Sequence, residues 1–294
     1  MKNLCRALLA ALLSSLASAA WAQIGVRDDR GVEHRFDAPP QRVVSLLPSL
    51  TESVCAVGAC TRLVGTDRYS NWPLQVRALP KLGGLDDALV ESIVALKPDV
   101  VLAASSTRAI ARLQALGLKV LAFDSDRHDQ VRTSLLALGR LFGDDAAAQR
   151  AWAAVEADME RAVARVPLAL RGRTVYFEAD AAPYAAGAAS FVGETLARLR
   201  LVNIAPVAMG PFPPLNPEAV VRAQPQVVMA AQRNLASMPQ RPGWGGLLAL
   251  KQGQVCAFDA ERYELLIRPG PRMGAAALVM ADCLAALPAP VASR

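Results

Sequence analysis

Short apolar runs alternate with amphipathic segments along the first half of the chain. The runs VVSLL (43–47), DVVLAAS (99–105) and LKVLAFD (118–124) are rich in β-branched residues, which is typical of buried strands. Between them, SLTESVCAVG (49–58) and LVESIVALKP (89–98) have helical spacing and end at a glycine or a proline. Strands that alternate with helices predict βαβ units and a parallel sheet.

The second half of the chain repeats this order. Residues 91–104, ESIVALKPDVVLAA, align with residues 218–231, EAVVRAQPQVVMAA, at an offset of 127 positions. A second pair, LKVLAFD and GQVCAFD, ends in Phe-Asp at an offset of 135. A repeat this long indicates two related lobes and not a solenoid of short units.

A different pattern separates the two halves. Residues 144–166 are rich in alanine and contain no glycine or proline, and Trp152, Val155, Met159 and Val163 recur at helical spacing. This pattern predicts a single helix of about 34 Å at 1.5 Å per residue.

The predicted fold class is therefore α/β, with two Rossmann-like lobes joined by a single long α-helix and a ligand cleft between the lobes. The predicted boundaries are an N-terminal lobe over 23–143, a connecting helix over 144–167 and a C-terminal lobe over 168–294.

The first 22 residues are typical of an export signal. Lys2 and Arg6 precede an apolar stretch over 8–16 that is too short to span a bilayer, and Ala20-Trp21-Ala22 resembles a small-residue cleavage site. We expect cleavage after Ala22 and a periplasmic mature protein.

Composition narrows the function classes. Apolar residues make up 53% of the 294, which supports a folded core. The net charge of +6 falls to +4 once the two basic residues of the signal are removed, so nothing indicates a nucleic-acid partner. The two histidines, His34 and His128, are expected at the surface, and their scarcity predicts no metal site and no required cofactor.

Cysteine pairing is open at this stage. The mature chain retains Cys55, Cys60, Cys256 and Cys283, which an oxidising compartment allows to pair in three ways. Cys55 and Cys60 flank the helix end expected at Gly58, so the geometry allows a short-range bridge. Buried free thiols at Cys256 and Cys283 are equally compatible with the sequence.

Several segments resemble a known family. GVRDDRGVEHRFDAPPQRVVSLLPSLTE (25–52), RLVGTDRYSNWP (62–73) and LVESIVALKPDVVLA (89–103) are similar to segments of the periplasmic binding proteins of ABC importers, in the class with one long connecting helix. The resemblance implies a monomer without enzymatic activity that delivers a small molecule to the permease dimer of an importer in the inner membrane.

Family members carry cobalamin, haem or ferric siderophores. The loop RYSNWP and the segment FPPLNPE (212–218) most resemble the cobalamin-binding branch. That resemblance implies ligand contacts for Tyr69, for Phe212 and for the stretch Glu264 to Arg268. Leu82 stands where the branch has another aromatic residue. The haem branch has a tyrosine where this chain has Gly84, so a cobalamin-type corrinoid is the expected ligand, with haem or a ferric siderophore as the alternative.

The expected parallel sheets also place aromatic residues near the cleft. Loops at the carboxyl ends of the strands face such a crevice, and Tyr69, Trp72, Phe191 and Phe212 lie on or beside these loops. Aromatic faces suit a large planar macrocycle, although ordinary core packing is the alternative for each ring. Arg268 and Arg272 flank a Pro-Gly-Pro turn and could donate to ligand amides or to a phosphate, or lie in solvent.

Two glutamates occupy matching positions in the repeat. Glu91 and Glu218 each begin the corresponding helix of their lobe. The family resemblance assigns such glutamates to salt bridges with permease arginines, which would orient the docked protein. An exported two-lobed enzyme is the remote alternative, but the sequence has no phosphate-binding glycine loop, G-x-S-x-G or HExxH motif.

Overall fold

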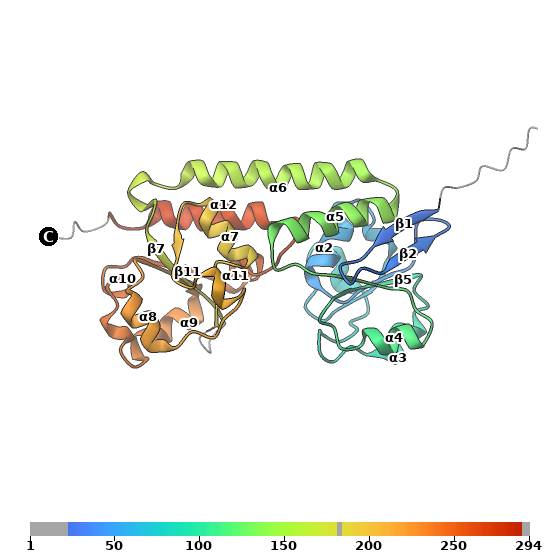
Figure 1. Cartoon of the computed structure of the whole chain (residues 1–294), viewed down its shortest axis with the longest axis horizontal. Coiled ribbons are helices and arrows are strands. Elements are labelled where there is room, and N and C mark those ends of the chain that lie inside the picture. Colours follow the sequence, from blue (N-terminus) through green and yellow to red (C-terminus); the bar gives the residue numbers. More distant parts are fainter. Residues whose placement is uncertain (1–22, 181–183, 290–294) are drawn as a thin grey trace, which may run out of the picture.

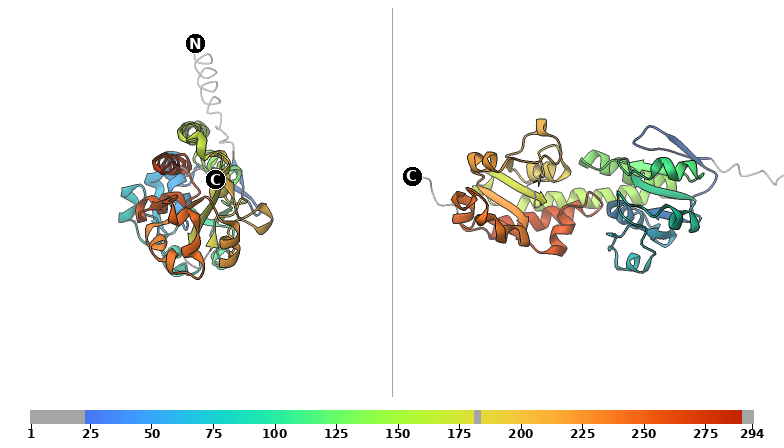
Figure 2. Two further views of the ribbon diagram at one scale, coloured as in Figure 1. Left: turned by 90° about the vertical axis from the view of Figure 1, so that its left-hand side faces the viewer. Right: turned by 90° about the horizontal axis from the view of Figure 1, so that it is seen from below.

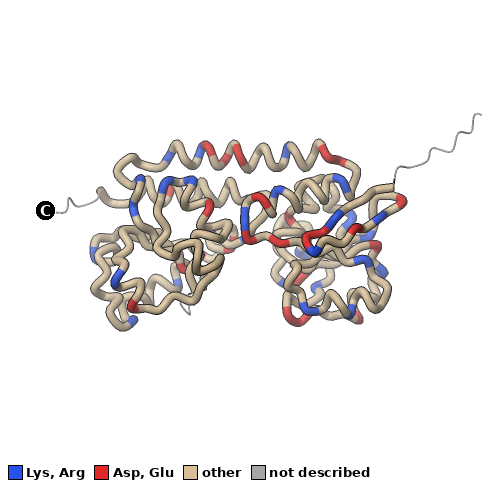
Figure 3. The backbone as a smooth tube through the Cα atoms, in the orientation of Figure 1, with Lys and Arg blue, Asp and Glu red and all other residues tan. Residues whose placement is uncertain are grey.

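The computed structural model describes residues 23–180 and 184–289, so the predicted export signal over 1–22 lies outside the described residues. Two α/β lobes lie side by side along one long helix, α6 (Figure 1). This arrangement confirms the predicted fold class. Among the described residues, no helix is both long enough and apolar enough to cross a membrane. Basic and acidic residues are interspersed over both lobes (Figure 3).

The N-terminal lobe is built on a parallel sheet with the strand order β4-β3-β5-β6. Its strands are β3 (Val43–Ser45), β4 (Leu63–Thr66), β5 (Val100–Ala104) and β6 (Val120–Phe123). Its helices are α2 (Pro48–Ala56), α3 (Val90–Ala95), α4 (Ile110–Ala115) and α5 (His128–Phe142). An antiparallel hairpin, β1 (Ile24–Arg27) and β2 (Glu33–Phe36), precedes the sheet. Val101 and Leu102 point to opposite faces of the sheet and are both fully buried, so apolar clusters cover both faces.

The C-terminal lobe has the strand order β11-β10-β7, with two short strands beyond β7. Its strands are β7 (Thr174–Asp180), β8 (Tyr184–Ala185), β9 (Val202–Asn203), β10 (Val227–Ala231) and β11 (Val255–Phe258). Its helices are α7 (Phe191–Arg198), α8 (Pro217–Ala223), α9 (Gln232–Ser237), α10 (Leu248–Lys251), α11 (Ala260–Leu266) and α12 (Met273–Ala286). Short 3-10 helices in the two lobes and their connection cover Cys60–Arg62, Leu74–Ala78, Leu168–Leu170, Val207–Met209, Met238–Gln240 and Trp244–Gly246.

The sequence repeat corresponds to a repeated structural unit. Helix α3 leads into β5 as α8 leads into β10, and each of these strands lies between two parallel neighbours. The similarity extends to the backbone, because Lys97 and Gln224, again 127 positions apart, have φ angles of 46° and 42°. Each precedes a proline, which disfavours the helical conformation in the residue before it, so each helix ends one or two residues before this position.

Helix α6 (Asp145–Arg165) packs against both lobes. The Asp144 side chain caps its start by accepting a hydrogen bond from the Ala147 amide at 2.7 Å. Its 21 residues span about 31 Å, and α6 runs behind both lobes in the view from below (Figure 2). Glycines allow the close packing: a Cβ on Gly139 of α5 would lie 2.5 Å from the Ala148 Cβ, and one on Gly274 of α12 would lie 2.6 Å from the Val155 oxygen.

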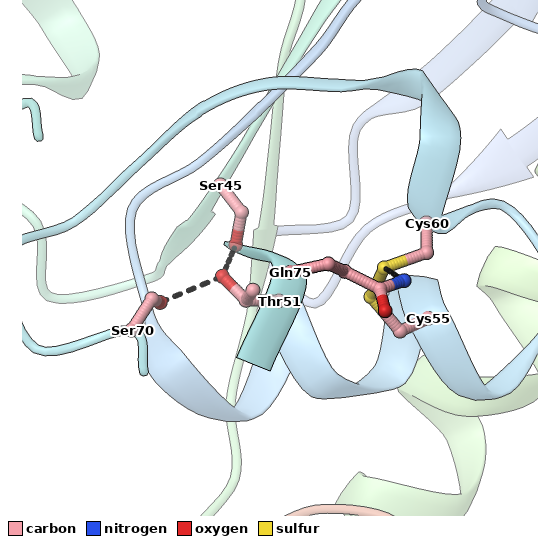
Figure 4. The surroundings of a disulfide bond; sticks show 6 residues. All are labelled: Ser45, Thr51, Cys55, Cys60, Ser70 and Gln75. Atoms are coloured by element: carbon pink, nitrogen blue, oxygen red, sulfur yellow. Dashed lines mark hydrogen bonds between the residues drawn. A yellow bond between two sulfur atoms is a disulfide. The ribbon is translucent and has the colours of Figure 1, made fainter. Parts of the chain in front are cut away.

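The structure contains two disulfides, Cys55–Cys60 and Cys256–Cys283. The first joins the end of α2 to the following turn (Figure 4), and the second joins β11 to α12. The cysteine pairing that the sequence left open is thus a local pair in each lobe. Neither Cys256 nor Cys283 is a free thiol.

The expectation that both histidines lie at the surface was wrong. His34 is buried with its Nε2 3.2 Å from an Asp28 carboxylate oxygen. His128 is buried at the start of α5, where its Nε2 lies 3.0 Å from the Phe191 carbonyl oxygen in the other lobe. Both imidazoles are buried because they have polar partners, which the sequence pattern does not reveal.

Candidate ligand-binding site

A cavity of about 1080 Å³ lies between the two lobes and is lined by residues of both. This volume lies just above the range of about 300–1,000 Å³ that is usual for small-molecule sites. Most of the lining residues lie at or just after the carboxyl ends of the strands, where parallel sheets present their loops, and the rest lie on α9, on α11 and in the segment after α11. They are Leu47, Pro48, Ser49, Arg68, Tyr69, Asn71, Ser125, Ala179, Asp180, Ala231, Gln232, Arg233, Ala236, Phe258, Asp259, Ala260, Tyr263, Glu264, Ile267, Arg268 and Pro269.

Most of the loops expected at the cleft are found there. The loops after β3, β4 and β10 and the end of β7 supply lining residues, as the sequence predicts. The described residues after β5 do not line the cavity, whereas Ser125 after β6 and residues 258–260 at the end of β11 do. The Asp259 carboxylate accepts a hydrogen bond from the Arg262 amide at 2.8 Å, which starts α11 directly beside the cavity.

Tyr69 is the most exposed aromatic side chain on the cavity wall, with 61% of its surface accessible. The Asp67 carboxylate fixes its loop by accepting hydrogen bonds from the Tyr69 amide at 2.8 Å and from the Ser70 hydroxyl. Burial raises the pKa of Asp67, and these hydrogen bonds oppose the rise. The Lys81 ammonium donates to the Ser70 carbonyl oxygen at 2.7 Å. A buried polar network therefore holds the backbone while the ring remains exposed.

Further contacts connect this loop to the N-terminal lobe. The Thr51 hydroxyl on α2 donates to the Ser45 hydroxyl at 2.9 Å and lies 2.8 Å from the Ser70 hydroxyl (Figure 4). At Gly84, an added Cβ would lie 3.3 Å from the Tyr69 ring, so the glycine leaves the space that the ring occupies.

The rim of the cavity is a polar network. The Arg268 guanidinium donates to the Asn71 Oδ1 at 2.6 Å, to the Tyr69 carbonyl oxygen at 3.1 Å and to the Glu264 carboxylate at 2.9 Å. The Asn71 amide nitrogen also donates to Glu264 at 2.8 Å. Asn71 belongs to one lobe and Glu264 to the other, so the rim itself joins the lobes. Glu264 remains half exposed and can accept hydrogen bonds from a ligand.

The formal charges of the described lining residues cancel. Three arginines face three acids, namely Arg68, Arg233 and Arg268 against Asp180, Asp259 and Glu264. Several of these groups are already paired within the protein: Arg68 with Asp87, Arg268 with Glu264, and Asp259 with Arg262. The wall therefore presents polar groups of both signs without a surplus of either. Over the described residues, no group of three or more His, Cys, Asp or Glu side chains could hold a metal ion.

Three of the six predicted ligand-binding residues, Tyr69, Glu264 and Arg268, line the cavity. The other three, Trp72, Phe191 and Phe212, are absent from its described wall. The Trp72 ring lies 4.9 Å from the Arg272 guanidinium. Phe191 is only 4% exposed, in the core of the C-terminal lobe.

The remaining aromatic position lies next to this core. Phe212 is 37% exposed, with its ring centroid 6.1 Å from that of Phe191. Leu82 is buried in the core of the N-terminal lobe. Phe191 therefore packs in the core, which was the alternative to ligand contact considered for each aromatic ring.

The sequence interpretation missed several residues of the site. Asn71 lies within the quoted loop RYSNWP but was not singled out, and Tyr263 directly precedes the predicted stretch 264–268. The Tyr263 hydroxyl donates to the Glu178 carbonyl oxygen at 2.7 Å, and burial raises the pKa of this phenol. Glu52 does not line the cavity, but its carboxylate accepts hydrogen bonds from Arg268 and Arg272, 216 and 220 positions away. Its only local signal is an acid early in a helix.

The two matching glutamates are exposed on separate lobes. Glu91 lies in the first turn of α3 and Glu218 in the first turn of α8, on the side of the molecule opposite α6 (Figure 1). The Glu91 carboxylate accepts a hydrogen bond from Arg112 at 2.5 Å. Both carboxylates are accessible to a partner that approaches this side.

Comparison with known proteins agrees with this architecture. Residues 43–261 match the family described as periplasmic binding protein. The chain is 27% identical over 242 residues to the vitamin B12-binding protein of Vibrio cholerae serotype O1, covering 80% of this chain and 85% of that protein. It is also 27% identical over 245 residues to the uncharacterized ABC transporter substrate-binding lipoprotein YvrC of Bacillus subtilis, covering 80% and 76%.

A solved structure shows the same fold. A periplasmic heme-binding protein from Pseudomonas aeruginosa matches with a TM-score of 0.73 at 22% sequence identity, over 86% of this chain and 96% of that one. The family match extends from β3 to the start of α11 and so includes both parallel sheets and most of the residues that line the cavity. The chain therefore belongs to the periplasmic binding protein family.

Proposed function

We propose that this protein binds a cobalamin-type corrinoid in the periplasm and delivers it to an ABC importer. The observation that carries the proposal is the cavity of about 1080 Å³, which combines the exposed Tyr69 ring with a rim of paired donors and acceptors. A corrin macrocycle has a broad apolar face and a periphery of amide groups. The ring suits that face, and Glu264, Asn71 and Arg268 suit the amides.

The charge balance of the wall favours a corrinoid over the alternatives. Haem carries two carboxylates and many ferric siderophores are anionic, so each is best matched by a surplus of basic groups. The described lining of this cavity has equal numbers of arginines and acids. Cobalamin, whose single phosphate is offset by the cobalt charge, matches such a wall better. The name of the Vibrio cholerae relative supports the same choice.

Haem is the second candidate ligand. The Tyr69 phenol is exposed at the cavity, and a tyrosine oxygen can serve as an axial ligand of haem iron. The heme-binding neighbour from Pseudomonas aeruginosa has the same fold. Against haem, Gly84 stands where the resembling haem proteins have a tyrosine, and the described lining contains no histidine.

A titration of the mature chain, residues 23–294, tests these assignments. We expect calorimetry to show saturable, one-site binding of cyanocobalamin and only weak binding of hemin. Absorbance spectra recorded with hemin should lack a shifted Soret band. Tight hemin binding with such a shift, and no binding of cyanocobalamin, would replace the corrinoid by haem. Binding of neither would contradict both and direct the search to a siderophore.

We also propose that Glu91 and Glu218 dock the loaded protein onto the permease dimer. Both are exposed on the same side of the molecule, one on each lobe, which suits a partner with two equivalent basic sites. Opposite charges at an interface steer the encounter and fix its orientation. The substrate-binding lipoprotein from Bacillus subtilis, named as part of an ABC transporter, supports such a partner, and the predicted export signal supports a periplasmic location.

The double variant Glu91→Ala/Glu218→Ala tests the docking proposal. We expect corrinoid uptake by cells to be abolished while the dissociation constant for cyanocobalamin, measured on the pure protein, stays unchanged. Glu160→Ala is a matched control because it removes an exposed acid from α6, on the opposite side. Normal uptake with the double variant, or a loss of ligand affinity, would contradict the assignment.

A further inference from the structure

A cluster of charged and aromatic side chains joins the two lobes beside the cavity. We call it the inter-lobe cluster; it consists of Glu52, Asn71 and Trp72 from the N-terminal lobe and Glu264, Arg268 and Arg272 from the C-terminal lobe. Its contacts join residues separated by about 200 positions in the sequence. The cluster therefore connects the lobes in addition to helix α6 and to the contacts of Arg127 and His128 with Phe191 and Glu194.

Glu52 is the buried centre of this cluster. It lies on α2 of the N-terminal lobe, and its side chain is only 2% exposed. Its two carboxylate oxygens accept hydrogen bonds from Arg272 Nε at 2.8 Å and Arg272 Nη2 at 2.5 Å, and Oε1 also accepts from Arg268 Nη1 at 3.3 Å. The bidentate pair defines both distance and orientation between its partners, because the guanidinium is planar and its donors are fixed.

The partners of Glu52 stand on rigid supports. Arg272 directly precedes α12, which packs along α6 and is joined to β11 by the disulfide Cys256–Cys283. Helix α2 is held in its own lobe by Leu50 and Val54, which are buried in the apolar core, and the disulfide Cys55–Cys60 joins its end to the following turn. Neither helix can shift freely within its lobe, so a change at the Glu52 contact must appear as a change between the lobes.

Arg268 extends the contact from Glu52 to the ligand cavity. It lines the cavity, yet its guanidinium makes four hydrogen bonds to protein acceptors: Glu52, Asn71, the Tyr69 carbonyl oxygen and Glu264. A ligand meets the groups that Arg268 holds in place. The Tyr69 backbone and the Glu264 carboxylate are therefore positioned through the same side chain that Glu52 anchors.

We infer that Glu52 is a positioning residue that fixes the relative orientation of the two lobes and, through Arg268, the geometry of the ligand rim. A carboxylate in this buried place is costly unless it is paired, so its removal leaves two arginines of the other lobe without their shared partner. The expected consequence is a wider range of lobe orientations and a disordered rim. The ligand part of this inference rests on the proposed function, whereas the orientation part does not.

The experiment measures lobe orientation and ligand affinity on the same variants of the mature chain. Spin labels at Ala115→Cys on α4 and Lys251→Cys on α10 report the distance between the lobes by pulsed electron paramagnetic resonance, since both positions are exposed. The four native cysteines of the mature chain are paired in disulfides, so labelling is confined to the introduced thiols. Calorimetry with cyanocobalamin supplies the affinity.

The informative variant is Glu52→Gln, and Glu178→Gln is its matched control. Glu178 is also a fully buried glutamate in an ion pair with an arginine, Arg241, but both of these residues lie in the C-terminal lobe. We expect Glu52→Gln to broaden the distance distribution and to raise the dissociation constant about tenfold, the effect of losing a hydrogen bond to a charged group. Glu178→Gln should leave the distance distribution narrow. If Glu52→Gln does not fold, Arg272→Lys makes the same test, because lysine keeps the charge and loses the bidentate fork.

The outcomes separate this inference from the proposed function. An unchanged distance distribution in Glu52→Gln would overturn the inference, whatever happens to ligand binding. A broadened distribution with unchanged affinity would overturn the link to the rim. If the unmodified protein binds no corrinoid, the proposed function fails, and the distance measurement alone still decides whether Glu52 fixes the lobes.

Discussion

The exposed ring of Tyr69 gives the most direct test of the proposed ligand. A fully buried tyrosine side chain buries about 150–250 Å² of surface, and 61% of the Tyr69 surface is accessible. A macrocycle stacked on one face of the ring would cover about half of that accessible area, or roughly 60 Å². At about 25 cal/mol per Å², this burial contributes about 1.5 kcal/mol to binding. Tyr69→Ala should therefore raise the dissociation constant for cyanocobalamin roughly tenfold.

The conservative variant separates stacking from coordination. Tyr69→Phe keeps the ring and removes the oxygen, so it should bind cyanocobalamin within about twofold of the unmodified protein if stacking is the main contribution. If the ligand is haem held by the phenol, Tyr69→Phe should instead abolish the coordination and the associated absorbance shift. Leu248→Ala on α10 is a control for truncating an exposed apolar side chain, because Leu248 is 55% exposed and does not line the cavity.

Isothermal titration calorimetry of the three variants against the same cyanocobalamin stock is the appropriate assay, with far-ultraviolet circular dichroism to verify folding. An unchanged dissociation constant for Tyr69→Ala would refute the reasoning, because a ring on the wall of the binding cavity cannot be removed without effect if the ligand covers it. An equal loss for Tyr69→Phe and Tyr69→Ala would also refute it and identify the hydroxyl as the contact.

Two further predictions concern stability. Removal of the Cys256–Cys283 disulfide by a double alanine variant should lower the free energy of unfolding by about 3.5 kcal/mol, and the same change at Cys55–Cys60 should lower it by about 2 kcal/mol. The difference arises because the entropy of loop closure grows with the number of residues between the cysteines, 27 in the first pair and 5 in the second. Urea denaturation measures both values, and the reverse order would contradict this account. Burial lowers the pKa of His128 in the folded protein below its ordinary value of 6.5, so on acidification the unfolded chain takes up the proton first. The contribution of neutral His128 to the free energy of unfolding is therefore complete above pH 6.5 and is lost as the pH falls towards the folded pKa. The melting temperature should therefore fall less between pH 7.5 and 5.5 in His128→Gln than in the unmodified protein, and an equal fall in both would exclude His128 as the cause.

Much of the fold could be predicted from the sequence because its elements carry local signals. The buried parallel strands are short apolar runs, and the repeat at residues 91–104 and 218–231 corresponds to two equivalent helix–strand units. The long helix was recognisable from its alanines, its apolar spacing and the proline that follows it. These signals are local because strand burial and helix periodicity depend on neighbouring residues.

The site was less predictable because it depends on direction and on distant partners. Tyr69 and Phe191 both follow a strand in the sequence, but only the Tyr69 side chain lines the cavity. Phe191 directly follows Ser190, whose hydroxyl caps α7 by accepting a hydrogen bond from the Gly193 amide at 3.0 Å. The helix therefore begins at Phe191, and its ring packs in the core of the C-terminal lobe. The pairing of Glu52 with Arg272 involves 220 positions of separation, and no local pattern identifies one as the partner of the other.

Lobe orientation connects the two proposed surfaces of the protein. Glu91 and Glu218 belong to different lobes, so the distance between them is set by whatever fixes the lobes relative to one another. Helix α6 holds the lobes on one side, and the inter-lobe cluster around Glu52 holds them beside the cavity. A partner with two fixed basic sites binds best to a pair of carboxylates at a constant spacing, because no binding energy is then spent on ordering them. Under these proposals a rigid carrier serves the permease and the ligand alike, since the contact proposed to keep Glu91 and Glu218 at a constant spacing also holds the rim proposed to bind the ligand.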